Sequence, residues 1–389
     1  MARLTFNCFI FITMKKILFF VASAIFLLAA CNNNDEVLTS LNHDNPQTPN
    51  EFAISNDEAK EVLTLFVNNG ATTRSDGKAI TVKDYKVRNV EVMTDNDKEI
   101  VPVYEYTTVN ENGDEGYAIV VGDRRIQKVL AQVEVGSIAD TAKIPPLKQF
   151  FESIPGVVSN DLNKYLLKES NSIATTRNMN EFYVYMIGPL IGTAWDQYSP
   201  YNSQCPYIGN TQCITGCTAI AIGQILAYYQ KPTNLNWSQI LQSSTITNSS
   251  SPTVINEVAT LLHNIGVALY AEYGTSWTNV TNANLSLVPS VFYSYGVTHC
   301  SSLTSFSLSS VIYEIQHYRP VFIKGSSHNW VCEGWKRHNY DPSTYYDYLY
   351  MNWGYGPYNN GFFYMDSTYS FLYVNGVHYV PSYMFINIY

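Results

Sequence analysis

The sequence predicts an α+β protein in which a small mixed unit precedes a larger part with a helical half and a sheet half. Two observations carry this prediction. The 389-residue chain is long enough for two domains, and its composition changes near Asn178, because all but five of its 31 tyrosines follow that residue. In the later part, helix-like patterns come first and strand-and-turn patterns fill the C-terminal end.

The N-terminal segment has the pattern of a secretory signal. Lys15 and Lys16 precede an apolar run that is too short to span a bilayer comfortably. We assign residues 1–30 to a signal peptide whose true start is Met14, directly before the lysines. Its last residues and Cys31 resemble a bacterial lipobox, which implies that Cys31 is lipidated after cleavage. A plain signal peptide cut nearby is the alternative.

Residues 31–50 form a polar, acidic tether that resembles the export signals of bacterial surface lipoproteins. The prediction is therefore an exported bacterial lipoprotein at the outer membrane or cell surface. It would contact the membrane only through its lipid anchor, and processing could release it.

Residues 51–168 are predicted to form a small α+β domain with its own core. A capping box at Ser55–Glu58 opens a helix. Residues 84–135 alternate as strands, with a hairpin turn near residues 110–114. Pro145 opens a further helix with apolar residues on one side.

A linker with a processing site is predicted over residues 169–180. The segment is polar and poor in apolar side chains, which is typical of an exposed connection. Arg177 is a candidate cleavage site for a trypsin-like activating protease. The alternative is an uncut linker between two domains.

The later part, residues 181–389, begins with a strand near residues 182–185. Further on, residues 254–265 have an amphipathic pattern that predicts a helix capped by Gly266. A shorter helix is expected over residues 309–318, stopped by the proline that follows.

Cys217 is the strongest candidate for a chemical role. Gly216 ends a loop, and a nearly uncharged apolar helix begins directly at the cysteine. A helix N-terminus carries about half a positive charge, so a thiol placed there ionises more easily. The thiolate is the nucleophile in covalent catalysis. The alternative is a small buried cysteine that only starts a core helix.

His328 and Asn352 lie in two strands rich in tyrosine and tryptophan, separated by a turn sequence over residues 337–343. If the turn is centred near Tyr340, a simple antiparallel hairpin places His328 opposite Asn352, with Cβ atoms about 5 Å apart. The amide could then orient the imidazole while the other ring nitrogen faces Cys217, which is a Cys–His–Asn arrangement.

These motifs, in this order, resemble the streptopain family of bacterial cysteine peptidases. The resemblance covers most of residues 181–389, and residues 51–168 resemble the inhibitory propeptide of that family. It implies a papain-like catalytic domain with a helical lobe and an antiparallel sheet lobe. The matching segments are the Cys217 helix start, the His328 strand, residues 352–356, and also residues 195–197, 200–202, 319–321 and 361–363.

The resemblance also implies a role for each site residue. Cys217 would be the nucleophile and His328 the general base and acid. Gln197 would bind the oxyanion beside the Cys217 backbone N–H, a kind of donor whose loss typically costs about 10²–10³ in rate. Asn352 would orient the histidine, and Trp353 would shield that contact from water. Taken alone, Gln197 also fits an ordinary surface glutamine, and Trp353 fits a core residue.

Two departures from the family pattern concern the substrate-binding loop. Ser327 stands where the family usually has glycine before the histidine. Tyr355 and Pro357 interrupt a Gly-Trp-Gly-Gly run that usually follows the Asn-Trp pair. Proline stiffens a loop that glycine would leave mobile.

No metal site or cofactor is expected, because the cysteine and histidine spacings match no zinc pattern and no phosphate-binding glycine loop is present. Few lysines and arginines follow Asn178, which argues against nucleic-acid binding by the later domain. Cys205 and Cys213 could form a disulfide or remain free buried thiols, since pairing cannot be deduced from sequence.

The function predicted from these observations is an exported, lipid-anchored cysteine endopeptidase made as a zymogen. Its substrates would be proteins or peptides, and its own propeptide would be an intramolecular inhibitor. Two other functions fit the same residues. One is a surface binding lipoprotein on a catalytically retired fold, and the other is an acyltransferase or transglutaminase-like enzyme with an amine acceptor.

Overall fold

The computed structural model describes residues 50–68, 80–94, 97–169, 184–275, 281–325, 327–341, 344–365, 373–374, 377–378 and 381–389. The predictions for the signal peptide, Cys31, the tether and Arg177 fall outside these residues. No helix in the described ranges is both long enough and apolar enough to cross a bilayer.

Residues 51–168, called the pro region below, contain the predicted mixture of helices and strands. The capping box is present, because the Ser55 N–H donates to the Glu58 carboxylate and the Glu58 N–H donates to Ser55 Oγ. The elements are α1 (Asn56–Asn68), β1 (Thr81–Met93), β2 (Lys98–Val109), β3 (Glu115–Val121), β4 (Lys128–Val133), the 3-10 helix η1 (Ile138–Lys143) and α2 (Pro145–Glu169).

A helical half follows, and its central helix begins at Cys217 as predicted. The prediction that Gly266 caps the amphipathic helix is wrong, because α5 continues to Ala268. Gly266 instead leaves room for Tyr273, whose hydroxyl would lie 2.3 Å from an added Cβ. The elements are β5 (Val184–Ile187), β6 (Tyr207–Ile208), β7 (Thr211–Gln212), α3 (Cys217–Tyr229), α4 (Trp237–Ile240), α5 (Pro252–Ala268), the 3-10 helix η2 (Leu285–Leu287) and α6 (Val288–Ser294).

The C-terminal part is mostly antiparallel sheet, called the sheet half below. Its helix is near its predicted position and ends before Pro320. The elements are β8 (Thr304–Ser305), α7 (Leu308–Gln316), β9 (Val321–Lys324), β10 (Asn329–Asp341), β11 (Thr344–Asn352), β12 (Gly361–Met365), β13 (Tyr373–Val374), β14 (Val377–His378) and β15 (Tyr383–Phe385).

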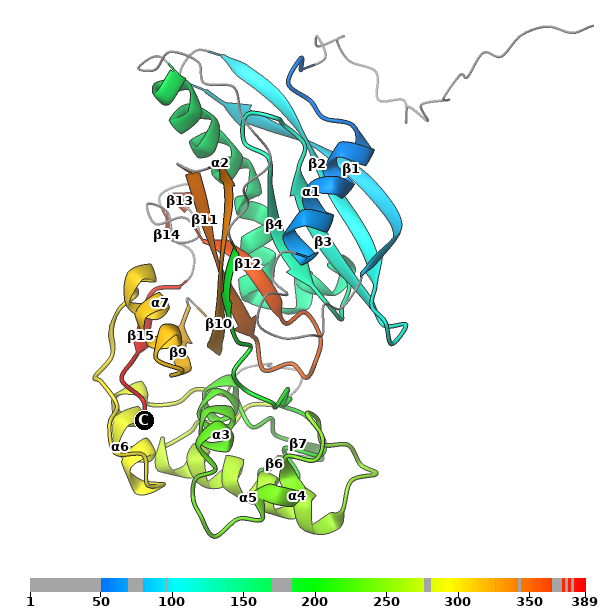
Figure 1. The fold of residues 1–389 in the computed structure, drawn as a ribbon. Coiled ribbons are helices and arrows are strands. Elements are labelled where there is room, and N and C mark those ends of the chain that lie inside the picture. Colours follow the sequence, from blue (N-terminus) through cyan, green and yellow to red (C-terminus); the bar gives the residue numbers. More distant parts are fainter. Residues whose placement is uncertain are drawn as a thin grey trace, which may run out of the picture. The chain divides into compact units, whose positions relative to one another are not determined.

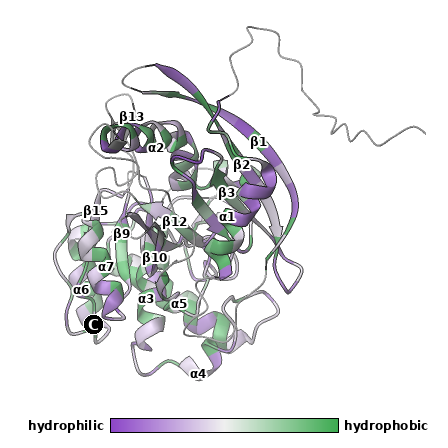
Figure 2. Cartoon of the chain, turned by 45° about the horizontal axis from the view of Figure 1, so that its top comes forward, coloured by the Kyte–Doolittle hydropathy of each residue, from purple (hydrophilic) through white to green (hydrophobic). Residues whose placement is uncertain are grey.

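One sheet joins the pro region to the sheet half (Figure 1). The strand order is β1-β2-β3-β4-β12-β11-β10-β9-β15-β8, and β5 also pairs with β10. The junction is antiparallel, with Gly361 opposite Val133 and Phe363 opposite Ala131. At the free edge, β1 is largely hydrophilic (Figure 2) and mostly exposed, which protects an unpaired strand from aggregation.

The buried side chains form two hydrophobic cores. One lies in the helical half around α3 and α5 and includes Phe322 and Val331 from the sheet. The other is shared between the pro region and the sheet half, as the contact between Phe66 and Tyr348 shows, with ring centroids 4.7 Å apart. The expectation that the pro region has a core of its own is therefore wrong. The domain boundaries remain predictions.

The hairpin register also differs from the prediction. Asn352 pairs with Val331 rather than lying opposite His328, which precedes β10. Register shifts fall between Cys332 and Gly334 and again near the turn, and each adds an unpaired residue to one strand. The main cause is the position of the turn, because Asp341 pairs with Thr344 and the hairpin therefore closes later than the predicted centre near Tyr340. The two bulges offset only part of that shift, so Val331 rather than His328 lies opposite Asn352.

Candidate active site

The loop before α3 positions Cys217 at the first turn of the helix. Gly216 has φ 89°, a conformation that favours glycine, and an added Cβ would lie 2.9 Å from the Thr281 side chain. No side chain caps this helix end. The backbone N–H groups of the first turn therefore remain available for a negative charge at the sulfur or at a bound substrate.

The ring of His328 hydrogen-bonds to Cys217 in the structure. Burial opposes ionisation of the Cys217 thiol, but the charge of His328 and a hydrogen bond from its ring favour the thiolate. The backbone N–H of Asn329 and the hydroxyl of Thr218 also donate to the sulfur, and the net effect lowers the pKa of the Cys217 thiol. The thiol remains partly exposed, so a substrate can reach it.

The ring of His328 is oriented by a backbone carbonyl. Its Nε2 lies 2.7 Å from the carbonyl oxygen of Trp353. A carbonyl can only accept, so Nε2 must carry a hydrogen. The other nitrogen, Nδ1, is then free to take the proton of Cys217 and return it later, which is the behaviour required of a general base and acid.

Asn352 does not lie where the sequence argument placed it. Its amide nitrogen donates to the Glu333 carboxylate and to the Thr193 carbonyl, both at 2.9 Å, and its oxygen accepts from Gln224 at 3.1 Å. These buried bonds fix the backbone one residue before the carbonyl that holds His328. Asn352 thus acts on the histidine through the backbone and not by side-chain contact, because the observed register puts Val331 opposite it.

Glu333 closes this network behind the histidine. It is buried, and it accepts from the Ile191 N–H as well as from Asn352. Burial outweighs these hydrogen bonds and raises the pKa of Glu333 to about 8. Sequence reasoning missed this residue, although an acidic residue inside an apolar strand was a visible signal.

Trp353 is a core residue with an additional role through its backbone. Its indole is buried between Trp330 and Phe363, with ring centroids 5.1 and 5.3 Å away, and its Nε1 donates to the Asn359 carbonyl. The expected shielding of an Asn352–His328 contact is therefore not observed, because no hydrogen bond joins those two described side chains.

Gln197 is buried rather than on the surface, and it is tied to the nucleophile loop. Both the N–H and the hydroxyl of Thr215 point to the Gln197 carbonyl, at 3.1 and 3.4 Å. Its side chain hydrogen-bonds to Tyr355, and the Tyr355 ring stacks on His328 with centroids 5.1 Å apart. Tyr355 thus connects the amide to the imidazole, a role that sequence reasoning missed.

Asn329 is the third residue that sequence reasoning missed. Its Nδ2 lies 3.7 Å from Cys217 Sγ and 2.8 Å from Thr218 Oγ1. Its position directly after His328 gave no signal, because successive residues of a strand point to opposite faces.

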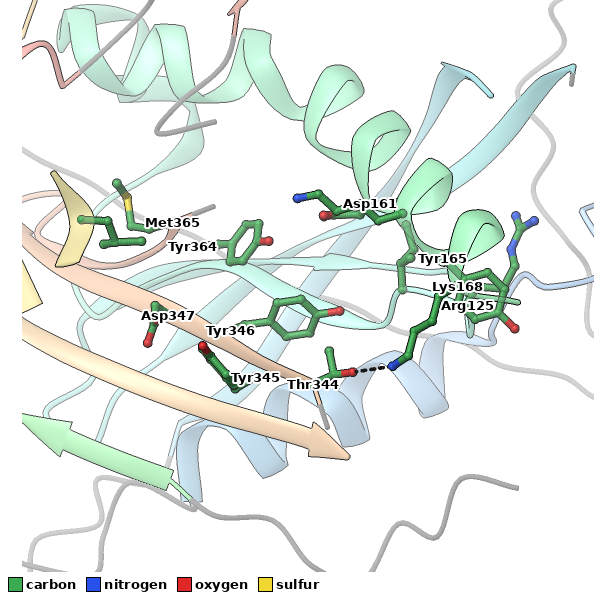
Figure 3. Close-up of a pocket in the computed structure, with 13 residues that line it drawn as sticks. Arg125, Asp161, Tyr165, Lys168, Thr344, Tyr345, Tyr346, Asp347, Tyr364 and Met365 are labelled. Carbon is green, nitrogen blue, oxygen red and sulfur yellow. Dashed lines mark hydrogen bonds between the residues drawn. The ribbon is translucent and has the colours of Figure 1, made fainter. Parts of the chain in front are cut away.

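Other features of the described residues hold no second catalytic centre. No group of three or more histidine, cysteine, aspartate or glutamate residues there could bind a metal ion. Cys205 and Cys213 are buried free thiols, as are Cys300 and Cys332. A cavity of about 290 Å³ lies away from Cys217, between α2 and strands β11 and β12 (Figure 3), at the contact between the pro region and the sheet half.

Comparisons with known proteins agree with this geometry. A model of the Peptidase C10 family matches residues 195–237 and 233–363. Streptopain of Streptococcus pyogenes is 22% identical over 365 residues, covering 81% of this chain and 86% of streptopain. The thiol protease/hemagglutinin PrtT of Porphyromonas gingivalis is 23% identical over 306 residues, covering 66% of this chain and 33% of that protein.

A solved structure shares the fold. A fragment of prointerpain A from Prevotella intermedia superposes with a TM-score of 0.52 at 18% identity, covering 78% of this chain and 99% of that fragment. The match extends over both the pro region and the later part, because residues 181–389 alone are too few to reach that coverage.

Proposed function

Because this chain is a streptopain-like cysteine peptidase with a propeptide, we propose that it is an exported, lipid-anchored zymogen whose Cys217 and His328 hydrolyse peptide bonds. The observation that carries the catalytic assignment is the hydrogen bond between Cys217, at the start of α3, and the ring of His328, which lowers the pKa of the thiol. Proteins or peptides are the proposed substrates, and no cofactor is required.

In the proposed acylation step, the Cys217 thiolate attacks the carbonyl carbon of the scissile peptide. The carbonyl π electrons move to oxygen, and the Cys217 backbone N–H and the Gln197 amide donate to the resulting oxyanion. His328 gives the proton on Nδ1 to the leaving amine as the C–N bond breaks. The product amine departs, and the acyl group remains on sulfur as a thioester.

Deacylation reverses the roles of the same groups. Neutral His328 takes a proton from water through Nδ1, and the oxygen of that water attacks the thioester carbonyl. The oxyanion forms again beside Gln197. The C–S bond then breaks, releasing the carboxylic acid and restoring the Cys217 thiolate beside a protonated histidine.

Positioning of His328 is proposed to depend on the Trp353 carbonyl and on the Asn352 network behind it. The carbonyl keeps hydrogen on Nε2 and stabilises the imidazolium that exists between the two steps. The amide of Asn352, held by Gln224 and Glu333, fixes that carbonyl without touching the ring.

The pro region is proposed to be the intramolecular inhibitor. It contacts the loop that follows Trp353, the residue whose carbonyl accepts from His328. The N–H of Asn359 in this loop donates to the Val135 carbonyl of the pro region at 2.7 Å, and the Asn359 carbonyl accepts from the Trp353 indole. Cleavage near Arg177, by this enzyme or by an activating protease, would separate the two parts.

The decisive test uses the chain from Cys31 onward, because the shared core argues against isolating the later part. We expect Cys217→Ala to abolish both peptide cleavage and self-processing. An epoxide-type thiol-protease inhibitor should label the unaltered chain on Cys217, as located by mass spectrometry. Asn256→Ala, on the exposed side of α5, is the matched control and should keep full activity. Undiminished cleavage of peptides by the Cys217→Ala protein would refute the assignment.

The lipid anchor is tested separately. Cells expressing the full chain are grown with a radioactive fatty acid, and the protein is recovered from membranes. We expect label on the unaltered chain and none on Cys31→Ser. Equal labelling of both would contradict the proposed site of lipidation.

A further inference from the structure

The side chain of Asn329 brings a neutral hydrogen-bond donor to the sulfur of Cys217, in addition to the hydrogen bond from the Asn329 backbone N–H. It is the first residue of β10, directly after His328, and it is partly buried. Its Nδ2 lies 3.7 Å from Cys217 Sγ and 2.8 Å from Thr218 Oγ1. The amide nitrogen has two hydrogens and accepts none, so one group can serve both contacts.

Thr218 completes a small donor chain. It follows the nucleophile in α3 and is buried. Because its oxygen accepts from Asn329, its own hydroxyl hydrogen remains free to donate to the neighbouring sulfur. Hydrogen bonds in such a chain polarise one another, and in a water-poor site they gain strength.

We propose that Asn329 and Thr218 form a neutral donor pair that keeps the Cys217 sulfur ionised after His328 has lost its proton. The inference rests on the proposed nucleophilic role of Cys217 and deepens it. The amide and hydroxyl keep their hydrogens across the working pH range, unlike the imidazolium, so their support for the thiolate does not disappear as pH rises.

The donor pair should also lower the nucleophilicity of the thiolate, an effect that a purely structural role of Asn329 would not have. A thiolate that accepts more hydrogen bonds is more populated but less nucleophilic, because nucleophilicity falls with thiol pKa with a Brønsted slope of about 0.4–0.5. Removing the donors should therefore slow alkylation in acid and accelerate it at the alkaline plateau. Loss of folding or of access would slow both.

The test measures alkylation of the full chain by iodoacetamide, with the adduct on Cys217 quantified by mass spectrometry from about pH 5 to about pH 10. For Asn329→Ala we expect about a tenfold lower rate near pH 5 and about a threefold higher plateau. Thr218→Val should move both in the same directions by less, and the double variant should add little to Asn329→Ala. A profile of Asn329→Ala that coincides with the unaltered chain would overturn the proposal.

A second arm removes the histidine, so that only the neutral donors remain. In a His328→Ala background, the Cys217 thiol should alkylate about tenfold faster near pH 7 when Asn329 is present than when it is alanine. Equal rates would show that the donors do not act on the sulfur independently of the imidazolium. Asn256→Ala again serves as the control, with an unchanged profile expected.

The same data distinguish failure of this inference from failure of the proposed function. If Cys217 of the unaltered chain alkylates with the profile of an ordinary thiol, the nucleophile assignment itself fails, and this inference fails with it. If the unaltered chain reacts rapidly in acid and both Asn329→Ala and Thr218→Val do the same, only the donor pair is rejected.

Discussion

The helical half differs from the pro region and the sheet half in the charge of its buried polar side chains. In the described helical half, the buried polar side chains are all uncharged: Thr193, Gln197, Asn202, Thr215, Thr218, Gln224, Thr275 and Thr281. In the described pro region and sheet half, ten acidic or basic side chains are buried: Asp123, Arg125, Lys128, Asp161, Glu314, His328, Glu333, Lys336, His338 and Asp347.

Part of the difference fits the proposed departure of the pro region, while Glu314, His328 and Glu333 belong to the sheet half itself. Burying a charge costs several kcal/mol before any partner repays it, so a permanent core has little reason to hold one. A core that opens when a propeptide leaves must expose a surface that water accepts. Lys336 and His338 fit this account, since both belong to β10 and both contact Phe66 of α1 in the zymogen.

The largest expected effect comes from Lys128, which is fully buried at the junction. Its ammonium lies 2.6 Å from the Asp161 carboxylate, with the rings of Tyr346 and Tyr364 at 3.8 and 4.5 Å (Figure 3 shows Asp161 and both rings). Burial opposes the charge, but these partners outweigh it and raise the pKa of Lys128. Lys128→Met removes the ammonium from the buried Asp161 carboxylate and should lower the free energy of unfolding by about 3–5 kcal/mol, measured by urea denaturation in the Cys217→Ala background.

Two further variants show whether charge causes that loss. Lys128→Met combined with Asp161→Leu removes both charges, so it should recover most of the stability. Lys60→Met breaks an exposed pair with Asp57 and should change the stability by less than about 0.5 kcal/mol. A loss below about 1 kcal/mol for Lys128→Met would mean that the junction tolerates buried charge as a surface does.

The parts of the site that depend on local sequence could be predicted. The glycine, the cysteine and the helix start are consecutive, and the physics of a helix N-terminus then places and activates Cys217. The contact of His328 with Cys217 followed from the family pattern. The partner of His328 could not be predicted, because the hairpin closes at Asp341 and Thr344, later than the turn sequence suggested, and a backbone carbonyl leaves no mark in the side-chain sequence.

The shared core could not be predicted from sequence for a different reason. Both β4 and β12 read as buried strands, but nothing in either pattern says that they pair across more than 200 residues of chain. Composition separated the pro region from the rest, and that separation suggested two cores. Lys336 and His338 are buried, but the sequence alone did not indicate that they face the pro region. That meaning became clear only when the pairing of β4 with β12 was known.

Lys336 gives the junction a dependence on pH whose direction can be worked out. Burial lowers the pKa of Lys336 to about 7, and burial with the nearby Lys336 charge lowers that of His338 to about 4. Unfolded, the lysine keeps its proton to about pH 10.4. Between about pH 7 and pH 10 the unfolded chain therefore binds more protons than the folded zymogen, so stability rises with pH there and is lost as pH falls. His338 continues this trend between about pH 6.5 and pH 4.

Lys336→Met removes the titrating amine and should flatten this dependence. A single group that is fully protonated unfolded and neutral folded contributes at most about 1.4 kcal/mol per pH unit, so the parent-minus-variant difference in slope should approach that value near pH 8–9. Urea denaturation of both proteins in the Cys217→Ala background, at about pH 7, 8 and 9, measures it. Taking the difference cancels titration of the tyrosines and thiols common to both.

Lys98→Met, whose exposed amine pairs with Glu91 on the free edge of the sheet, should keep the parent slope. If the free energy of unfolding had the same slope against pH in Lys336→Met and its parent, the amine would stay charged beside Phe66. Acidification would then not weaken this contact.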